Sequence, residues 1–249
     1  MRDYNLEYQD VEDRLYSYDF DYIMHHYMMK SFQPWIKPGK VLEMGCYKGE
    51  FTSLLLKSYE DITVIEASSE LIRETKNKLG KANINYIHSA FESALLDEKF
   101  DAIFLIHTLE HLDDGVTVLK KINRWLSNQG VLFLAVPNAY AASRQLAVKM
   151  NIIAFNNAVS EAEWAHGHRR TYSFDTLERE VKIANLNIIN RGGVFFKAVA
   201  NFQFDLMLKH KIINQQYLDA CYALGLQYPE LCASIFFICE KGEMTNEKN

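Results

Sequence analysis

The most constraining feature of the chain is an apolar strand that runs directly into a glycine-containing turn and then into a helix, over residues 41–52. Gly45 and Gly49 let the backbone approach a ligand where a Cβ atom would collide or force an unfavourable φ. The helix that follows offers free N–H groups at its start. The segment therefore predicts a cradle for a nucleotide-like cofactor.

Two side chains of this segment discriminate between cofactors. A dinucleotide site requires G-x-G-x-x-G, but Tyr47 stands where the second glycine should be, which disfavours a pyrophosphate pressed against the backbone. Glu43, just before the turn, would repel a diphosphate but could pair with an ammonium group. A cofactor without phosphates is expected.

Composition narrows the class of protein. A chain of 249 residues, 49% apolar and 24% charged, is expected to form one large globular domain with insertions. Its net charge of -5 provides no basic field for a polyanion, so a small-molecule partner is expected and nucleic acid is not. Its apolar runs are too short for a membrane span. Four cysteines without a C-x-x-C pair, and the absence of a signal-peptide pattern, predict a cytoplasmic location.

Short β-type runs alternate with helical stretches along most of the chain, after a leading helix expected over 18–32. This alternation predicts an α/β fold with parallel strands and crossover helices. The expected strands are 41–45, 62–67, 84–89, 100–106, 131–136, part of 186–196, and 233–239. The expected helices are 49–58, 69–79, 116–126 and 174–184, with a helical insertion over 201–224. Residues 128–130 (Asn-Gln-Gly) are expected to stop the helix before them.

Glu66 ends the second expected strand about twenty residues after the glycine turn, where an acid can bind both ribose hydroxyls. With Glu43, Gly45 and Gly49, it resembles the acid-x-Gly-x-x-x-Gly motif and the second-strand acid of class I S-adenosylmethionine-dependent methyltransferases. Residues 100–112, which begin Phe-Asp and contain His107, resemble the fourth motif of that family.

The resemblance continues through the fifth expected strand, over 126–138, and spans roughly residues 24–196. It implies a Rossmann-like, seven-stranded, mostly parallel sheet with helices on both faces, in one methyltransferase domain over 1–249. The expected parts are a leading helical lid (1–38), a cofactor-binding core (39–138), an acceptor-side insertion (139–173), the C-terminal part of the sheet with its helical insertion (174–241), and a tail (242–249).

The cofactor that the resemblance implies is S-adenosylmethionine, with S-adenosylhomocysteine as product. Where many relatives carry Gly-Asp after the third strand, this chain has Ser89-Ala90-Phe91-Glu92, so backbone at Ala90 and the ring of Phe91 are expected to hold adenine. Glu92 could supply the missing carboxylate or equally cap a short helix. The expected cofactor contacts are Glu43, Gly45, Tyr47, Gly49, Glu66, Ala67, Ala90, Phe91 and His107.

The polar cluster 166–173 resembles the His-x-Arg-x-Tyr-Ser segment of small-molecule and sugar methyltransferases. His168 and His107 are the expected catalytic residues, since an imidazole can take a proton from a hydroxyl or an ammonium acceptor. An equally weighted alternative is that His168 and Arg170 only fix the insertion. The expected acceptor contacts are His166, Arg169, Arg170, Tyr172 and Asn138. No metal is expected, because the histidines lack a recognised ligand spacing backed by carboxylates or thiolates.

The resemblance favours O-methylation of a small polar metabolite, namely a sugar nucleotide or a phosphoramidate-type precursor of a surface polysaccharide such as a capsule. A phosphoramidate oxygen is already anionic, so Arg169 or Arg170 would orient it without a base. The alternatives are N-methylation of an amino sugar, a dinucleotide-dependent sugar reductase or epimerase, and a donor-binding partner protein without turnover. The oligomeric state is left open.

Overall fold

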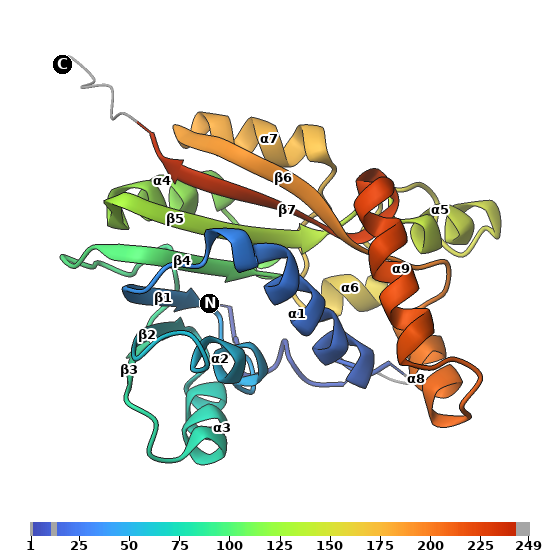
Figure 1. Cartoon of the computed structure of the whole chain (residues 1–249), viewed down its shortest axis with the longest axis horizontal. Coiled ribbons are helices and arrows are strands. Elements are labelled where there is room, and N and C mark those ends of the chain that lie inside the picture. Colours follow the sequence, from blue (N-terminus) through green and yellow to red (C-terminus); the bar gives the residue numbers. More distant parts are fainter. Residues whose placement is uncertain (1, 11–13, 243–249) are drawn as a thin grey trace.

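The computed structural model describes residues 2–10 and 14–242 and is built on a seven-stranded sheet (Figure 1). The strand order is β3-β2-β1-β4-β5-β7-β6, in which β1 to β5 pair in parallel and β7 runs antiparallel to both its neighbours. The strands are β1 (Lys40–Met44), β2 (Asp61–Glu66), β3 (Ile84–His88), β4 (Phe100–Ile106), β5 (Leu126–Pro137), β6 (Leu186–Phe196) and β7 (Cys232–Lys241). The predicted Rossmann-like, mostly parallel sheet is confirmed.

Helices lie between most of the consecutive strands, and the described residues also form three short 3-10 turns. The helices are α1 (Asp19–Phe32), α2 (Glu50–Leu55), α3 (Ser69–Leu79), α4 (Gly115–Trp125), α5 (Ala142–Lys149), α6 (Glu161–Ala165), α7 (Phe174–Ile183), α8 (Asn201–Lys209) and α9 (Gln215–Gln227). The 3-10 turns are η1 (Gln33–Trp35), η2 (Leu109–His111) and η3 (Pro229–Leu231). None of the helices within the described ranges has the length and apolar character that a membrane span needs.

Two hydrophobic cores lie on the two faces of the sheet. Side chains alternate between the faces along each strand. Val41 and Phe104 therefore belong to one core, whereas Leu42 and Ile103 belong to the other. Buried residues of α1, α2, α8 and α9 complete the first core, and those of α4 and α7 complete the second.

One predicted boundary is wrong. Residues 128–130 do not stop a helix, because α4 already ends at Trp125 and these residues lie inside β5. The pairing of β5 with β4 shifts register between Phe100 and Ala102, which accommodates the polar start of the strand. Gly130 is required there, since a Cβ atom would lie 2.6 Å from the Phe100 carbonyl oxygen. Of the predicted tail, 243–249 lies outside the described residues.

Glu43 is the last but one residue of β1, with 2% of its surface exposed, and Thr52 and Glu66 lie near its buried carboxyl. Within the described part of the chain, neither of its carboxylate oxygens has a hydrogen-bond partner. Burial penalises the charged form and raises the pKa of this carboxyl from 4.5 to about 8. Glu43 is therefore neutral in the folded protein at neutral pH.

This shifted pKa makes stability depend on pH. The folded state keeps the proton up to about pH 8, whereas the unfolded chain releases it near 4.5, so the stabilising contribution of Glu43 is lost as pH rises through 8. Glu43→Gln retains the size of the side chain and stays neutral. Between pH 7 and pH 9, its free energy of unfolding should fall by about 1 kcal/mol less than that of the wild type.

Urea unfolding at both pH values measures this difference, with the exposed Glu60→Gln as the matched control. The buried histidines His25, His107 and His168 have lowered pKa values and titrate below this window, so they do not mask the effect. Equal pH slopes for Glu43→Gln and the wild type would show that the carboxyl is charged in the fold.

Candidate functional site

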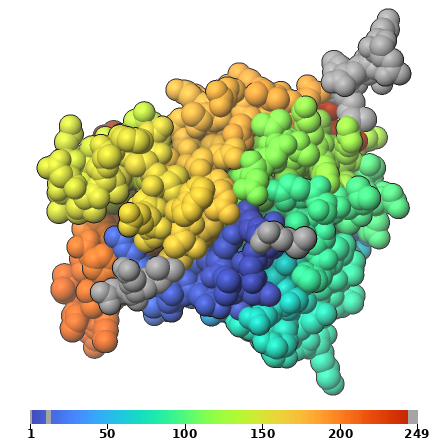
Figure 2. All heavy atoms as spheres, turned by 180° about the vertical axis from the view of Figure 1, so that it is seen from behind, coloured from blue at the N-terminus to red at the C-terminus, as the bar shows by residue number. Residues whose placement is uncertain are grey.

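A cavity of about 400 Å³ lies at the carboxyl ends of β1, β2 and β4. The order of the sheet reverses between β1 and β4, and open α/β sheets bind ligands at such a switch point. One wall consists of the glycine turn and the ends of the strands. The opposite wall comes from the N-terminal segment, including Arg2, Glu7 and Tyr8. Figure 2 shows this blue segment between the gold insertion and the cyan part of the core.

The glycine turn adopts the backbone geometry that its sequence predicts. Gly45 has φ 86° and Gly49 has φ 77°. A Cβ atom would lie 2.9 Å from the Thr108 hydroxyl oxygen at Gly45, and 2.8 Å from the Thr75 methyl carbon at Gly49. Close approach of other elements therefore requires glycine at both places, and the turn cannot widen to admit a side chain.

Tyr47 replaces a glycine in sequence but adopts a φ of 46°, a conformation that non-glycine residues rarely take. Such strain costs on the order of 1–3 kcal/mol and persists where surrounding contacts hold it. Here the Tyr47 hydroxyl lies 3.1 Å from the Ser17 hydroxyl, and its ring lies 5.1 Å from that of Tyr16. The strained residue thus joins the glycine turn to the N-terminal wall.

The carboxylate of Glu66 lies at the end of β2 and lines the cavity. It accepts hydrogen bonds from the backbone N–H groups of Cys46, at 3.1 Å, and Ser68, at 2.9 Å. Burial raises the pKa of this carboxyl, and the backbone donors oppose the rise. Glu66 therefore fixes the glycine turn while facing the cavity.

The predicted adenine end of the cavity is lined by Ala67, Ala90 and Phe91. The neighbouring Glu92 also lines the cavity. Its Oε1 atom is buried and has no hydrogen-bond partner among the described residues. An amino group that entered this end would find both an apolar ring and an unpaired oxygen.

Other predicted site residues lie away from the cavity wall. Glu43 and Gly49 stand behind the turn rather than on its surface. Asn138 donates to the carbonyl oxygens of Glu230 and Cys232, and Tyr172 is buried with its hydroxyl 2.9 Å from Glu180. These contacts tie chain segments together.

The two predicted acceptor arginines are also engaged with the chain itself. Arg169 pairs with Asp113 at 3.0 Å and with Glu7 at 3.4 Å. Arg170 donates to the carbonyl oxygens of Leu112 and Asp113 and pairs with Glu180. The contacts of Arg170 correspond to the alternative in which this cluster fixes the insertion.

The polar end of the cavity contains the three histidines that the sequence predicts as site residues. His107, His166 and His168 all line it, together with Glu110 and His111. His107 has a positive φ of 47°, and its Nε2 lies 2.8 Å from the Ser234 hydroxyl. Burial lowers the pKa of His107 to about 3 and that of His168 to about 4, so both rings are neutral at neutral pH.

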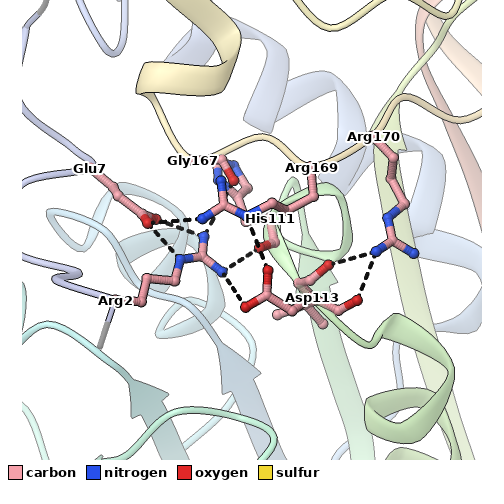
Figure 3. Close-up of polar contacts among 8 residues, drawn as sticks. Arg2, Glu7, His111, Asp113, Gly167, Arg169 and Arg170 are labelled. Atoms are coloured by element: carbon pink, nitrogen blue, oxygen red, sulfur yellow. Dashed lines mark hydrogen bonds and ion pairs between the residues drawn. The ribbon is translucent and has the colours of Figure 1, made fainter.

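A cluster of four charged side chains closes this end, formed by Arg2, Glu7, Asp113 and Arg169 and called the clasp below (Figure 3). Arg2 binds both carboxylate oxygens of Glu7, at 2.5 and 2.7 Å. It also donates to the carbonyl oxygens of His111, at 2.6 Å, and Gly167, at 3.3 Å. The clasp therefore joins the N-terminal segment, the η2 turn and the insertion.

Sequence reasoning missed several residues of the cavity. Lys197 lines it beside Asp21 and Asn201, and burial lowers the pKa of this ammonium to about 8. Glu110 also lines it, and burial raises the pKa of its carboxyl to about 8. Lys197 follows the end of β6 without any motif, so no local signal could have identified it.

A methyltransferase domain family model matches residues 17–190 of the chain, which is more than half of its length. The chain belongs to this family. Its members include S-adenosylmethionine-dependent enzymes, and the residues that line the cavity fit that cofactor: Glu66 for the ribose hydroxyls, and Phe91 with the unpaired oxygen of Glu92 for adenine.

Known relatives of this methyltransferase chain act on different acceptors. It is 24% identical to a ubiquinone biosynthesis O-methyltransferase of Sinorhizobium fredii, with 69% of each chain covered. It is 26% identical to (S)-coclaurine N-methyltransferase of Thalictrum flavum over 105 residues, 40% of this chain and only 29% of that protein. The N-methyltransferase NodS of Bradyrhizobium japonicum, solved with S-adenosylhomocysteine, has the same fold (TM-score 0.57, 14% identity, 91% and 90% covered).

The methyltransferase assignment makes Glu66 the residue to test for donor binding. Glu66→Ala removes the predicted acceptor for the ribose hydroxyls and the anchor of the Cys46 N–H. Since hydrogen bonds to charged groups contribute about 1.5–3 kcal/mol, S-adenosylhomocysteine should bind roughly 10- to 100-fold more weakly. Titration calorimetry measures this, with exposed Glu60→Ala as control. Unchanged affinity would remove Glu66 from the donor site.

Proposed function

We propose that this chain transfers the methyl group of S-adenosylmethionine to an oxygen atom of a small polar acceptor. The observation that carries the proposal is the single cavity that extends from the glycine turn to the polar end at His107 and His168. Similarity over 69% of the length of an O-methyltransferase supports oxygen as the acceptor atom.

Methyl transfer from a sulfonium is an in-line displacement, so the chain mainly aligns donor and acceptor and excludes water. The donor supplies an electrophilic methyl group when it is bound. Tyr47 and the N-terminal segment, which line the cavity, would cover the donor, and a hydroxyl acceptor at the polar end would have to lose a proton. His107 and His168 are our candidates to receive that proton, because both line the cavity and both rings are neutral at neutral pH.

The sequence suggests a sugar nucleotide or a phosphoramidate as acceptor. None of the three relatives is named as an enzyme of surface polysaccharides. Arg169 and Arg170, the cations predicted to orient an anionic acceptor, are paired with carboxylates of the chain itself. Lys197 also lines the cavity, and Arg2, the other cation among the lining residues described, is paired with Glu7, so we assign any anion contact to Lys197.

An acceptor panel tests the proposed reaction. Purified protein and labelled donor are incubated with nucleotide sugars, phosphoramidates and amino sugars, and the products are analysed by mass spectrometry and NMR. We expect label on oxygen, and less label with Glu66→Ala when the donor is not saturating. Label on nitrogen alone would favour N-methylation of an amino sugar. If the protein binds NAD but not S-adenosylhomocysteine, a reductase or epimerase would be favoured. Donor binding without any transfer would indicate a partner protein.

Lys197→Met tests whether the acceptor is anionic. Loss of the ammonium should raise KM at least tenfold for an anionic acceptor and leave kcat within about threefold, because the contact is made equally in the ground and transition states. Exposed Lys81→Met is the control. An unchanged KM for the preferred acceptor would show that Lys197 does not contact it.

A further inference from the structure

Three side chains at the polar end of the cavity offer ligand atoms at one point. Glu110 and His111 belong to the η2 turn, and His168 comes from the insertion, 57 positions further along the chain. One carboxylate oxygen and one ring nitrogen from each histidine all lie within 4.8 Å of one another. The rings of His111 and His168 meet edge to face with centroids 4.5 Å apart.

The burial of Glu110 is a second, independent indication that a ligand binds at this end of the cavity. Its side chain is 1% exposed, and neither carboxylate oxygen has a hydrogen-bond partner within the described residues. A buried carboxylate without a partner is costly and is usually paired with a cation or hydrogen-bonded. The nearby arginines do not pair with Glu110, because Arg2 and Arg169 are paired with Glu7 and Asp113 in the clasp. The clasp carries no net charge, so its arginines are not available to a charge on Glu110.

The surrounding backbone holds the three groups together. The Arg169 N–H donates to the Glu110 carbonyl oxygen at 2.8 Å, and Arg2 bridges the carbonyl oxygens of His111 and Gly167 (Figure 3). Gly167 allows the close approach, since a Cβ atom there would lie 3.1 Å from His111 Nδ1. These contacts hold the η2 turn against the insertion, from which the three side chains come.

We propose that Glu110, His111 and His168 bind a divalent transition-metal ion at the acceptor end of the cavity. Two imidazoles and a carboxylate suit zinc and its first-row neighbours better than magnesium or calcium, which prefer oxygen ligands. A tetrahedral ion holds its ligand atoms roughly 3.3–3.6 Å apart, so small side-chain rotations close the set. Because all three residues line the cavity, a fourth position faces the acceptor.

The sequence predicts no metal because the histidines lack a recognised ligand spacing backed by carboxylates or thiolates. The structure brings His168 to the adjacent residues Glu110 and His111. Since His168 lies 57 positions after His111 in the chain, only the fold reveals the set.

The role of the ion rests on the proposed function. A metal-bound hydroxyl has a lowered pKa and loses its proton to water at neutral pH. Its oxygen lone pair then forms the bond to the methyl carbon, and the carbon–sulfur bond breaks with its electron pair remaining on sulfur. In this arrangement His168 holds the metal and is not the base.

Metal binding is measured first, without any acceptor. Full-length protein is stripped with a chelator and dialysed against Zn²⁺, Mn²⁺ or Mg²⁺, and bound metal is determined by elemental analysis. We expect one Zn²⁺ or Mn²⁺ per chain and weaker binding of Mg²⁺. Glu110→Gln and His168→Ala should each lower the affinity at least tenfold. Exposed His210→Ala should bind as the wild type does.

Two further measurements distinguish loss of the metal ligands from damage to the fold. S-adenosylhomocysteine binding by each variant reports whether the cavity is intact. Paramagnetic shifts on adding Co²⁺ to the wild type should appear on the ring protons of His111 and His168, which requires no mutation. Absence of metal from the wild type at millimolar concentration, or unchanged affinity in both Glu110→Gln and His168→Ala, would overturn the site.

Activity separates this inference from the proposed function. Removing metal should lower kcat for a hydroxyl acceptor at least tenfold, leave S-adenosylhomocysteine affinity unchanged, and be reversed by added Zn²⁺ or Mn²⁺. Full-rate O-methylation by metal-free protein would overturn the role of the ion while oxygen methylation stands. Metal binding with label on amines alone would leave the site standing and overturn the proposed function.

Discussion

The hydrogen bonds of one carboxylate, that of Glu66, organise the cofactor side of this chain. They join the turn after β1, through Cys46, to the turn after β2, through Ser68, whose own side chain caps α3. Both turns are consequently held at the carboxyl edge of the sheet, where parallel strands direct their ends toward one site. The positive φ angles of Gly45, Tyr47 and Gly49 are tolerable because this anchor and the packing of Thr75 and Thr108 fix the turn on either side.

Glu43 and Glu110 are two other buried carboxyl groups with a raised pKa. The consequence of this shift differs between them because they lie at different positions in the fold. Burial raises the pKa of each to about 8, and within the described chain neither has a hydrogen-bond partner. Glu43 lies behind the turn, closed off from the cavity, so its burial affects mainly stability and its pH dependence. Glu110 faces the cavity beside two imidazoles, so a ligand can compensate it. The distinction depends on which side chains line the cavity rather than on the pKa values.

Most of the fold was predictable because its signals are local. Apolar runs of strand length, helical periodicity and the glycine turn act within about fifteen residues, and they located α1, β4 and α7 to within one residue. The start of β5 was not predictable, because the polar residues 128–130 form a strand only by pairing with β4. In the site, Glu66 and Phe91 could be named from motifs. Arg2 and Lys197 could not, since they reach the cavity only through contacts with residues far away in the chain.

The two walls of the cavity differ in what stabilises them, and this difference bears on the polar end. The strand wall rests on both hydrophobic cores, whereas the contacts of segment 2–10 are polar, and its Leu6 is 59% exposed. Polar contacts of this kind contribute less than apolar burial and weaken with salt. Yet Arg2, from this less stable wall, binds the carbonyl oxygens of both His111 and Gly167. The alignment of His111 with His168 therefore depends on a segment that is held to the cofactor core by a few surface contacts, such as those of Asn5 with Ser68 and Tyr8 with Glu70, so conditions that loosen the clasp should separate these two rings before they unfold the sheet.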